Sequence, residues 1–350
     1  MCLANDGFEE DSNGHYQRDS ETGRFLPSHC FEGFEGRSHL FGEGFHPRED
    51  SKRQSGNGVQ ERTAISAHHH SARCCDFDNV VPDEGLQDVY FDELREVLVK
   101  HAEEQLMNVT MHEDVDSLIA NADKYAGFIS IGPSPLDRKT LHRLHRKLPH
   151  GVFIDINPAP ELFDSVQPDL EQTILDAIDA LTTSGCSRIG FIGGLGNIMG
   201  EHEYPEDIRT FAFRNWTLRL DLDVQGLVYA NGPFTVENGR LQGRQLLQDH
   251  ADDLPDAVIV AADPLAVGVL QAFATENVIV PRDIKVISIN NQEIAKYTSP
   301  ALSSYDISQD ELAKAAVLML AEALTANRKI SQHMRISTSL VARDSFTPQD

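Results

Sequence analysis

Val258-Ile-Val-Ala-Ala-Asp-Pro-Leu-Ala-Val-Gly268 is the stretch that decides the fold. Its apolar start has the length and composition of a buried strand. Asp263 and Pro264 then favour a helix start, because Asp can accept hydrogen bonds from the free amides of a first helical turn and Pro loses no needed donor there. The stretch therefore predicts a buried strand followed at once by a helix.

The same alternation of short strands and amphipathic helices extends in both directions along the chain. This rhythm predicts an α/β fold with parallel sheets, in which the loops at the carboxyl ends of the strands can converge on a polar ligand. Ser308 and Glu311 form a capping box before a further helix. The predicted strands are 128–131, 152–156, 189–192, 224–229, 257–260 and 286–291, and the predicted helices are 86–99, 136–148 (basic-faced), 170–183, 207–220, 236–247 and 312–324.

The bulk composition narrows the function classes. A chain of 350 residues with 40% hydrophobic content is long enough for two compact domains. The net charge of -25 repels polyanions, and we expect no Lys/Arg-rich stripe and no non-specific DNA binding by the chain as written. No apolar run reaches membrane-spanning length, and the first thirty residues lack the features of a secretion signal. We expect a cytoplasmic protein with no membrane partner.

The cysteine pattern predicts neither a disulfide framework nor a metal site. The chain has five cysteines, of which Cys2, Cys30, Cys74 and Cys75 lie in the irregular first part. Cys74 and Cys75 stand near residues 68–70, which are all histidine, but adjacent ligands without a spaced partner pair do not match tetrahedral zinc spacing. Reduced thiols and no bound metal are expected.

Polar and aromatic residues stand where the predicted strands end, which suggests a sugar site. Sugars are bound by polar side chains that match neighbouring hydroxyls and by an aromatic face that covers the C–H surface of the ring. Each residue alone has a bland alternative: Asp263 could be a helix cap, Arg209 a surface ion pair and Phe234 part of the core. Their shared position at carboxyl strand ends favours a common cleft. The residues of this set are Asp155, Arg209, Phe234, Asp263 and Asn290.

No catalytic motif supports an enzyme. Gly190, Gly193 and Gly196 have the spacing of a dinucleotide-binding loop, but the first glycine lies inside the predicted strand and no helix opens at the third. Signatures of nucleophilic, metal-dependent and nucleotide-dependent catalysis are absent from the sequence. We expect a binding protein that is not an enzyme and needs no cofactor.

Over residues 85–346 the chain resembles the LacI/GalR family of transcriptional regulators, in particular members that control galactoside operons. The resemblance rests on 88–95 (DVYFDELR), 152–156 (VFIDI), 163–166 (FDSV), 184–194 (SGCSRIGFIGG), 262–268 (ADPLAVG), 296–302 (KYTSPAL) and 340–345 (LVARDS). It implies a periplasmic-binding-protein-like fold, with two parallel-sheet α/β subdomains joined by three crossovers. We place these near Ile156, Ile289 and Ile307.

The resemblance implies particular boundaries and site residues. One subdomain would comprise residues 81–156 plus 290–307, and the other 157–289 plus 308–346. Tyr90 and Phe91 would line the effector cleft, Asp155 and Arg209 would clamp hydroxyls, and Phe234 would stack on the sugar. Many relatives carry Asp where this chain has Asn290, and Asn or Ser where it has Ala262.

The resemblance also implies a function and partners. Such a chain would be a sugar-responsive repressor that forms a homodimer, binds a galactoside-like effector and thereby loses or gains affinity for operator DNA. A sugar carrier of a transport system, without DNA binding, is the alternative. It would carry a signal peptide or a lipidated cysteine, and Cys2 lacks the apolar lead-in for the latter.

Residues 1–80 lack both helical and strand periodicity, and their composition is that of a disordered tail. Back-translation offers another interpretation. With suitable synonymous codons, residues 26–34 read one base later give SPATVSRVL, a helix-turn-helix recognition segment. Residues 15–25, 46–51 and 57–59 give TIKEIAKLAGF, TRERIL and MGY, pieces of the same family's DNA-binding headpiece in the same order. We predict a frameshifted headpiece, restored between Cys75 and Gln87, or a native disordered extension, and no strand over 68–78.

Overall fold

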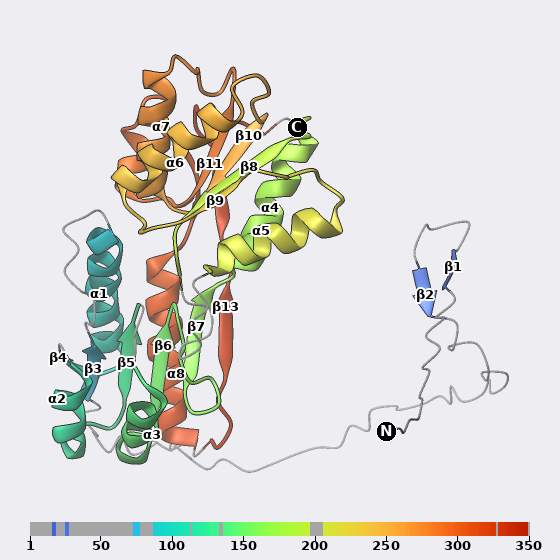
Figure 1. The fold of residues 1–350 in the computed structure, drawn as a ribbon. Coiled ribbons are helices and arrows are strands. Elements are labelled where there is room, and N and C mark those ends of the chain that lie inside the picture. The colour runs from blue at the N-terminus through green and yellow to red at the C-terminus, as the bar shows by residue number, and fades with distance from the viewer. Residues whose placement is uncertain are drawn as a thin grey trace, which may run out of the picture. The chain divides into compact units, whose positions relative to one another are not determined.

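The computed structural model describes residues 87–348, apart from 113, 133–135, 197–205 and 327, together with the backbones of three short strands before them (Figure 1). The chain divides into two units, residues 1–64 and residues 65–350. In the first unit, β1 (Tyr16–Arg18) pairs antiparallel with β2 (Phe25–Pro27). The prediction of a frameshifted or disordered headpiece otherwise falls outside the described residues.

The second unit contains two lobes, each built around its own sheet. The first lobe has a four-stranded parallel sheet in the order β13-β7-β6-β5, and β3 pairs parallel with β4 and lies against β5. Its helices are α1 (Gln87–Glu104), α2 (Val115–Ala120), α3 (Arg138–Lys147), α8 (Gln309–Ala326) and the 3-10 helix η1 (Ala122–Lys124). Its strands are β3 (Arg73–Phe77), β4 (Asn108–His112), β5 (Phe128–Ile131), β6 (Gly151–Ile154), β7 (Asp164–Pro168) and β13 (His333–Ile336).

The second lobe has a six-stranded sheet in the order β14-β12-β11-β10-β8-β9, parallel except for β14. Figure 1 shows α6 and α7 on one side of this sheet and α4 and α5 on the other. The strands are β8 (Ile189–Gly193), β9 (Val228–Ala230), β10 (Ala257–Val260), β11 (Lys285–Asn290), β12 (Ser303–Asp306) and β14 (Ser339–Val341). The helices are α4 (Leu170–Thr183), α5 (Ile208–Arg219), α6 (Val236–Asp249), α7 (Asp263–Thr275) and the 3-10 helix η2 (Glu293–Lys296).

Local sequence signals account for many of these elements. β5 and β10 coincide with the predicted strands 128–131 and 257–260, and all residues of both strands are buried. The predicted cap before α8 is confirmed, because the Ser308 hydroxyl accepts a hydrogen bond from the Glu311 amide at 3.2 Å. The strand predicted over 224–229 is reduced to β9, which follows a tight turn at Gly226 with φ +75°.

The chain passes between the lobes three times, as predicted, but not at the predicted places. The passages follow β7 at Asp169, β12 at residues 307–308 and β13 at residues 337–338. Only the passage near Ile307 matches the prediction, and the crossovers near Ile156 and Ile289 are wrong.

The predicted subdomain boundaries are therefore wrong as well. β7 pairs with β6, so the first lobe continues past residue 156, and β12 pairs with β11, so 290–307 belongs to the second lobe. Helix α8 packs against β5, β6 and β7, and β13 joins β7, so most of 308–336 belongs to the first lobe. The partners of a strand can lie far away in sequence, and the local sequence pattern of the strand does not predict which strands they are.

The prediction of no strand over residues 68–78 is also wrong, because β3 occupies residues 73–77. Its backbone pairs with β4 along its full length. A short strand beside other parallel strands obtains its hydrogen bonds from their backbones, so it does not need an apolar pattern of its own. Separately, no helix among the described residues is long and apolar enough to cross a membrane.

Candidate functional site

The centre of the candidate site is Arg209, at the amino end of α5. Asp207 caps this helix by accepting from the Arg209 amide at 2.9 Å. The same carboxylate receives the Arg209 side chain as a fork, with Nε donating at 2.6 Å and Nη2 at 2.9 Å. Nη1 donates to the carbonyl oxygen of Ala261 at 2.8 Å, just beyond β10. The guanidinium is thus held by two neighbouring strand-end loops, and a planar fork held in this way is pre-organised for hydroxyl groups.

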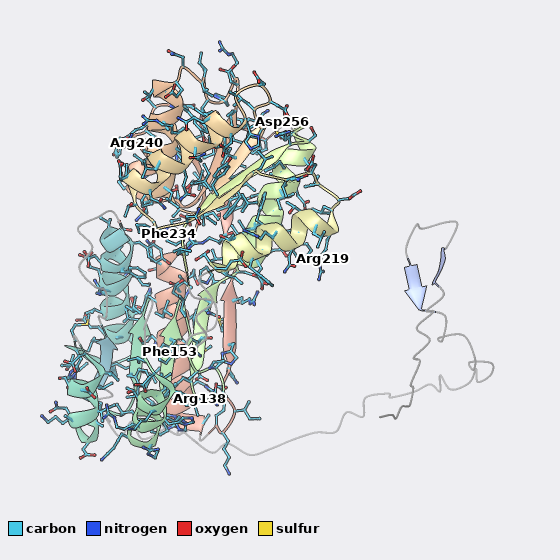
Figure 2. The ribbon with its side chains drawn as sticks, viewed as in Figure 1. Arg138, Phe153, Arg219, Phe234, Arg240 and Asp256 are labelled. Carbon is cyan, nitrogen blue, oxygen red and sulfur yellow. The ribbon has the colours of Figure 1, made fainter. Side chains whose placement is uncertain are left out.

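The aromatic wall beside Arg209 is Phe234, in the loop before α6. The Arg209 Cζ atom lies 4.7 Å from the centroid of the Phe234 ring, within the range of a cation–π contact. The ring also packs on the backbone after β8, because a Cβ atom on Gly194 would come within 2.8 Å of it. Figure 2 labels Phe234 at the edge of the second lobe that faces the first. The absence of a side chain at Gly194 therefore allows the Phe234 ring to pack directly against the backbone.

The first lobe contributes Tyr90 and Phe91 from α1 and Asp155 from the loop after β6. The two rings meet edge to face with centroids 5.2 Å apart, and both are at most 9% exposed. Phe91 packs over Gly132, at the end of β5. Asp155 has φ +80°, a left-handed conformation that costs a non-glycine residue free energy and that Asp adopts more readily than most residues.

Electrostatic coupling links the two lobes at this place. Burial raises the pKa of Tyr90, and the negative charge of Asp155 raises it further while Arg209 opposes both. Burial also raises the pKa of Asp155 to about 6, against the attraction of Arg209 and with a contribution from Asp207. The charges of Asp155 and Arg209 are therefore close enough to influence each other, although they belong to different sheets.

The Asp207–Arg209 pair stays ionised despite its burial. Burial would raise the pKa of Asp207, but the guanidinium outweighs this and lowers the pKa below its usual value. Burial would lower the pKa of Arg209, but Asp207, and then Asp155 and Tyr90, raise it. Each side chain of the pair is 13% exposed. Arg209 therefore keeps its positive charge at the site, and a small part of each side chain is exposed to solvent.

Asp263 is not part of this cluster, contrary to prediction, and it is not the helix cap either. The cap position of α7 is Ala262, which makes no side-chain hydrogen bond. The Asp263 carboxylate is fully buried, and accepts from the Gln292 amide at 2.6 Å and from the Ser304 hydroxyl at 2.7 Å. Burial raises its pKa to about 6, and these hydrogen bonds oppose that rise. Its role is to fasten α7 to the ends of β11 and β12.

Asn290 ends β11 with φ +106° and is half-buried. Its side chain makes no hydrogen bond to the described residues. The adjacent Asn291 is fixed, by contrast, since it donates to Asp306 at 2.8 Å and accepts from Arg343 at 2.6 Å. The structure thus brings Tyr90, Asp155, Arg209 and Phe234 together, with Phe91 beside Tyr90, while Asp263 is bonded elsewhere and Asn290 stands at a strand end.

Sequence reasoning missed Asp207 as a site residue. The signal was present, because Asp207 directly precedes the predicted helix and Arg209 follows two residues later. A carboxylate that caps a helix lies next to the side chains of its first turn. An arginine in that turn can therefore be gripped by the cap.

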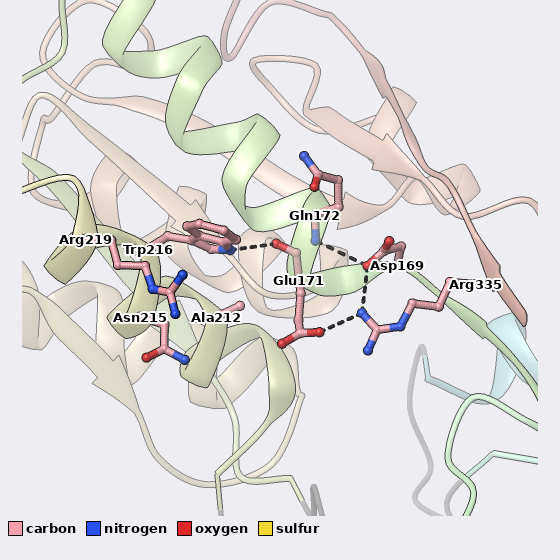
Figure 3. A pocket seen from close by; sticks show the side chains of 8 residues that line it. All are labelled: Asp169, Glu171, Gln172, Ala212, Asn215, Trp216, Arg219 and Arg335. Carbon is pink, nitrogen blue, oxygen red and sulfur yellow. Dashed lines mark hydrogen bonds and ion pairs between the residues drawn. The ribbon is translucent and has the colours of Figure 1, made fainter. Parts of the chain in front are cut away.

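A separate cavity of about 340 Å³ lies between α4, α5 and β13 and contains none of the predicted site residues. Figure 3 shows Glu171 between Trp216 and Arg335. The Trp216 indole donates to the Glu171 carbonyl oxygen at 3.2 Å, and Arg335 bonds the Glu171 and Asp169 carboxylates at 2.6 and 3.1 Å. Because Arg335 belongs to β13 and the two acids flank the first passage between lobes, these contacts join the lobes.

No group of three or more His, Cys, Asp or Glu side chains in the described part of the chain is placed to hold a metal ion. The cysteines and histidines of residues 68–75, for which no metal was predicted, have side chains outside the described set.

Comparisons with known proteins agree with this architecture. Residues 178–346 match the model of a family described as "Periplasmic binding protein-like domain". The HTH-type transcriptional regulator LacR of Lactobacillus helveticus is 42% identical over 268 residues, which cover 77% of this chain and 79% of that protein. GanR of Bacillus subtilis (strain 168), also an HTH-type transcriptional regulator, is 34% identical over 263 residues, or 75% of this chain and 79% of that protein.

Among solved structures, a LacI family transcriptional regulator from Arthrobacter sp. FB24 in complex with lactose superimposes with a TM-score of 0.64 at 20% identity. The match covers 79% of this chain and 99% of that chain, and shows that the fold is shared. Together with the sequence relatives, these findings show that the chain belongs to the LacI/GalR family of transcriptional regulators.

Proposed function

We propose that the chain is a sugar-responsive repressor whose effector is a galactoside-like sugar bound between the two lobes. Arg209 and Asp155 would bind neighbouring hydroxyls from opposite lobes, and Phe234 and Tyr90 would cover the apolar faces of the sugar. Phe91 supports Tyr90, and Asn290 supplies an amide at the rim. Asp263 is excluded from direct contact because both of its oxygens are bonded within the second lobe.

One observation supports the proposal most directly: a guanidinium, a carboxylate and aromatic rings from the two lobes lie close together. Arg209 lies 4.7 Å above Phe234 and interacts electrostatically with Asp155 and Tyr90. A guanidinium and a carboxylate can together satisfy a pair of vicinal hydroxyls, and rings provide the apolar complement. A sugar without hydroxyls at the matching positions would leave these buried charges without hydrogen-bond partners and would therefore bind weakly. This difference is the basis of sugar selectivity.

The names of the relatives favour a galactoside effector and a regulator. The Arthrobacter regulator was solved with lactose, and the Lactobacillus relative is named LacR. These relatives are transcriptional regulators, so a sugar carrier of a transport system is not favoured, and neither is an enzyme.

The proposed mechanism is a shift of the population between an open and a closed arrangement of the two lobes. A sugar held by both lobes binds better to the closed arrangement, so it draws the population toward that state. In a homodimer bound to a palindromic operator in the cytoplasm, such a rotation would change the spacing of the two DNA-binding headpieces.

The test is a titration calorimetry panel on the full chain with lactose, galactose, glucose and maltose. We expect binding of lactose or galactose that is at least tenfold tighter than that of glucose and maltose. Selection of duplexes from a randomised pool, repeated with the bound sugar present, then tests operator control. Equal affinity for all four sugars, or no heat with any of them, would overturn galactoside sensing.

A further inference from the structure

Helix α3 carries a stripe of positive charge that the sugar site does not use. Lys139, Arg143, Arg146 and Lys147 are exposed and follow one another at helical spacing, so they share one face over about 12 Å. The prediction of a basic-faced helix over 136–148 is confirmed, whereas the expectation of no Lys/Arg-rich stripe, which was based on the net charge of -25, is wrong. The net charge of a whole chain does not reveal a local cluster.

The opposite face of α3 fixes the stripe in place. Leu141 and Leu144 are buried in a cluster that also contains Phe128 and Phe153 of the four-stranded sheet. Asp137 caps the helix by accepting from the Thr140 amide at 2.6 Å. The cations therefore project from a rigid element, and ordering them on a partner costs less conformational entropy than ordering a mobile tail.

Acidic neighbours neutralise little of this charge. Arg143 bonds Asp116, but the two side chains are 46% and 75% exposed, and exposed pairs contribute little free energy. Arg138, on the adjoining face, approaches Glu161 at 3.6 Å. Lys139, Arg146 and Lys147 make no ion pair with any described residue, although Lys139 contributes to the lowered pKa of the neighbouring Asp137.

The remaining negative charge of the chain acts on the stripe only weakly. At physiological ionic strength the Debye length is about 8 Å, so exposed carboxylates farther away are screened. Figure 1 shows α3 at the end of the first lobe that lies away from the six-stranded sheet. A long polyanion could reach α3 there without approaching the sugar site.

We propose that the α3 stripe contacts the phosphate backbone of duplex DNA, independently of base sequence, while the regulator is on its operator. This rests on the proposed operator binding, which brings DNA to the molecule. Two features favour DNA over an acidic protein: the cations form a regular row, and the described face offers them no apolar anchor between charges. Phosphate contacts of this kind add affinity and position a protein without specifying sequence.

The experiment measures fluorescence anisotropy of a labelled random-sequence duplex of about 30 base pairs with the full chain, from about 25 to 200 mM KCl. The test variant is Lys139→Gln/Arg146→Gln/Lys147→Gln. The matched control, Arg282→Gln/Lys296→Gln/Lys314→Gln, removes the same charge from other exposed sites. A charge-conserving variant, Lys139→Arg/Arg146→Lys/Lys147→Arg, tests whether charge or shape matters.

We expect the test variant to bind at least tenfold more weakly at low salt, and its slope of log affinity against log salt to fall by about 3, or about 0.9 for each lost phosphate contact. The control and the charge-conserving variant should keep the wild-type slope. Equal slopes for the test and control variants would overturn the proposal, as would a wild-type chain that binds no duplex at low salt. A test variant that loses binding to polyglutamate but not to DNA would assign the stripe to an acidic protein instead.

Sugar titrations on the same variants separate this inference from the proposed function. All three triple variants should bind lactose like the wild type, since none of their positions belongs to the residues proposed to bind the sugar. If the wild type does not bind sugar but the test variant has a reduced salt slope for DNA binding, only the proposal of galactoside sensing is overturned. Normal sugar binding with an unchanged slope would remove the α3 contact alone.

Discussion

The Arg209 guanidinium lies over the ring of Phe234, with Cζ 4.7 Å from the ring centroid, although Arg209 belongs to the first turn of α5 and Phe234 to the loop before α6. Asp207 and the Ala261 carbonyl hold the guanidinium from its edges. These contacts therefore join the amino end of α5 to the segments that follow β9 and β10.

Substitution of Arg209 should weaken sugar binding severely. Arg209→Gln removes a charge whose hydrogen bonds a shorter amide cannot replace, and we expect a loss of 10- to 100-fold in affinity, or about 1.4 to 2.8 kcal/mol. Titration calorimetry with lactose measures it. The matched control is Arg219→Gln on the same helix, where the guanidinium lies over Trp216 at 5.4 Å in the separate cavity. A similar loss in both variants would count against the proposed site.

The pKa of Asp155 predicts the pH dependence of sugar binding. Burial raises this pKa from 3.8 to about 6, and the ionised carboxylate is the form that accepts two hydroxyl hydrogen bonds. Affinity should therefore decline as the pH falls through about 6, and Asp155→Asn should flatten the profile. An unchanged pH profile in that variant would contradict the role of Asp155.

The same raised pKa has an opposite effect on folding stability. Between pH 3.8 and about 6 the folded chain holds a proton on Asp155 that the unfolded chain has released. The contribution of this group to stability is therefore present at low pH and is lost as the pH rises through about 6. Urea unfolding of the wild type and Asp155→Asn across this window should diverge in that direction, and a divergence of the opposite sign would exclude the assignment.

Two arginines near β13 should differ sharply in their effect on stability. Arg328 forms a two-pronged pair with the buried Asp164, at 2.9 and 2.7 Å, whereas Arg335 is 53% exposed where it meets Asp169 and Glu171. We expect Arg328→Gln to lower the free energy of unfolding by about 3 kcal/mol, because it leaves a buried carboxylate without its charged partner. Arg335→Gln should lower it by less than about 1 kcal/mol. Urea unfolding of both variants gives the comparison, and equal costs would refute it.

The close approach of α6 and α7 predicts a strong effect of one methyl group. A Cβ atom on Gly268 would lie 1.9 Å from the Val236 carbonyl oxygen, so the helices must move apart to accept it. Gly268→Ala should cost about 3 kcal/mol despite the better helix propensity of Ala. Gln271→Ala, at an exposed position of the same helix, is the control and should change stability by less than about 0.5 kcal/mol in thermal or urea unfolding.

The sequence was informative where the signal is local. The apolar runs of β5 and β10 and the cap at Ser308 depend on neighbouring residues, and their positions were predicted correctly. Asp263 shows the limit of such reasoning. It stands where a helix cap would stand, but its partners are Gln292 and Ser304, which only the folded sheet brings near.

Lobe membership could not be predicted from local pattern for the same reason. β7 and β13 are separated by more than half of the described chain and yet are direct neighbours, with Val166 beside Met334. The sequence of β7 (Asp164–Pro168) is mostly polar and does not show which sheet the strand joins. Asp155, Arg209 and Phe234 were expected to lie together because carboxyl strand ends of parallel sheets gather polar loops, whereas Tyr90, on α1, was expected from the family resemblance alone. Asp207 was overlooked because its position suggests only a helix cap, whereas its carboxylate also accepts hydrogen bonds from the Arg209 side chain.

The position of β13 and α8 in the first lobe has a consequence for synthesis on the ribosome. The sheet begun by β5 and β6 cannot be completed until residue 336 has been translated and has left the exit tunnel. By then the strands β8 to β12 of the second lobe have already emerged. The lobe that starts first therefore cannot be completed until all of the second lobe's strands except β14 have been made, and until then the sheet surfaces later covered by α8 and β13 remain open to chaperones.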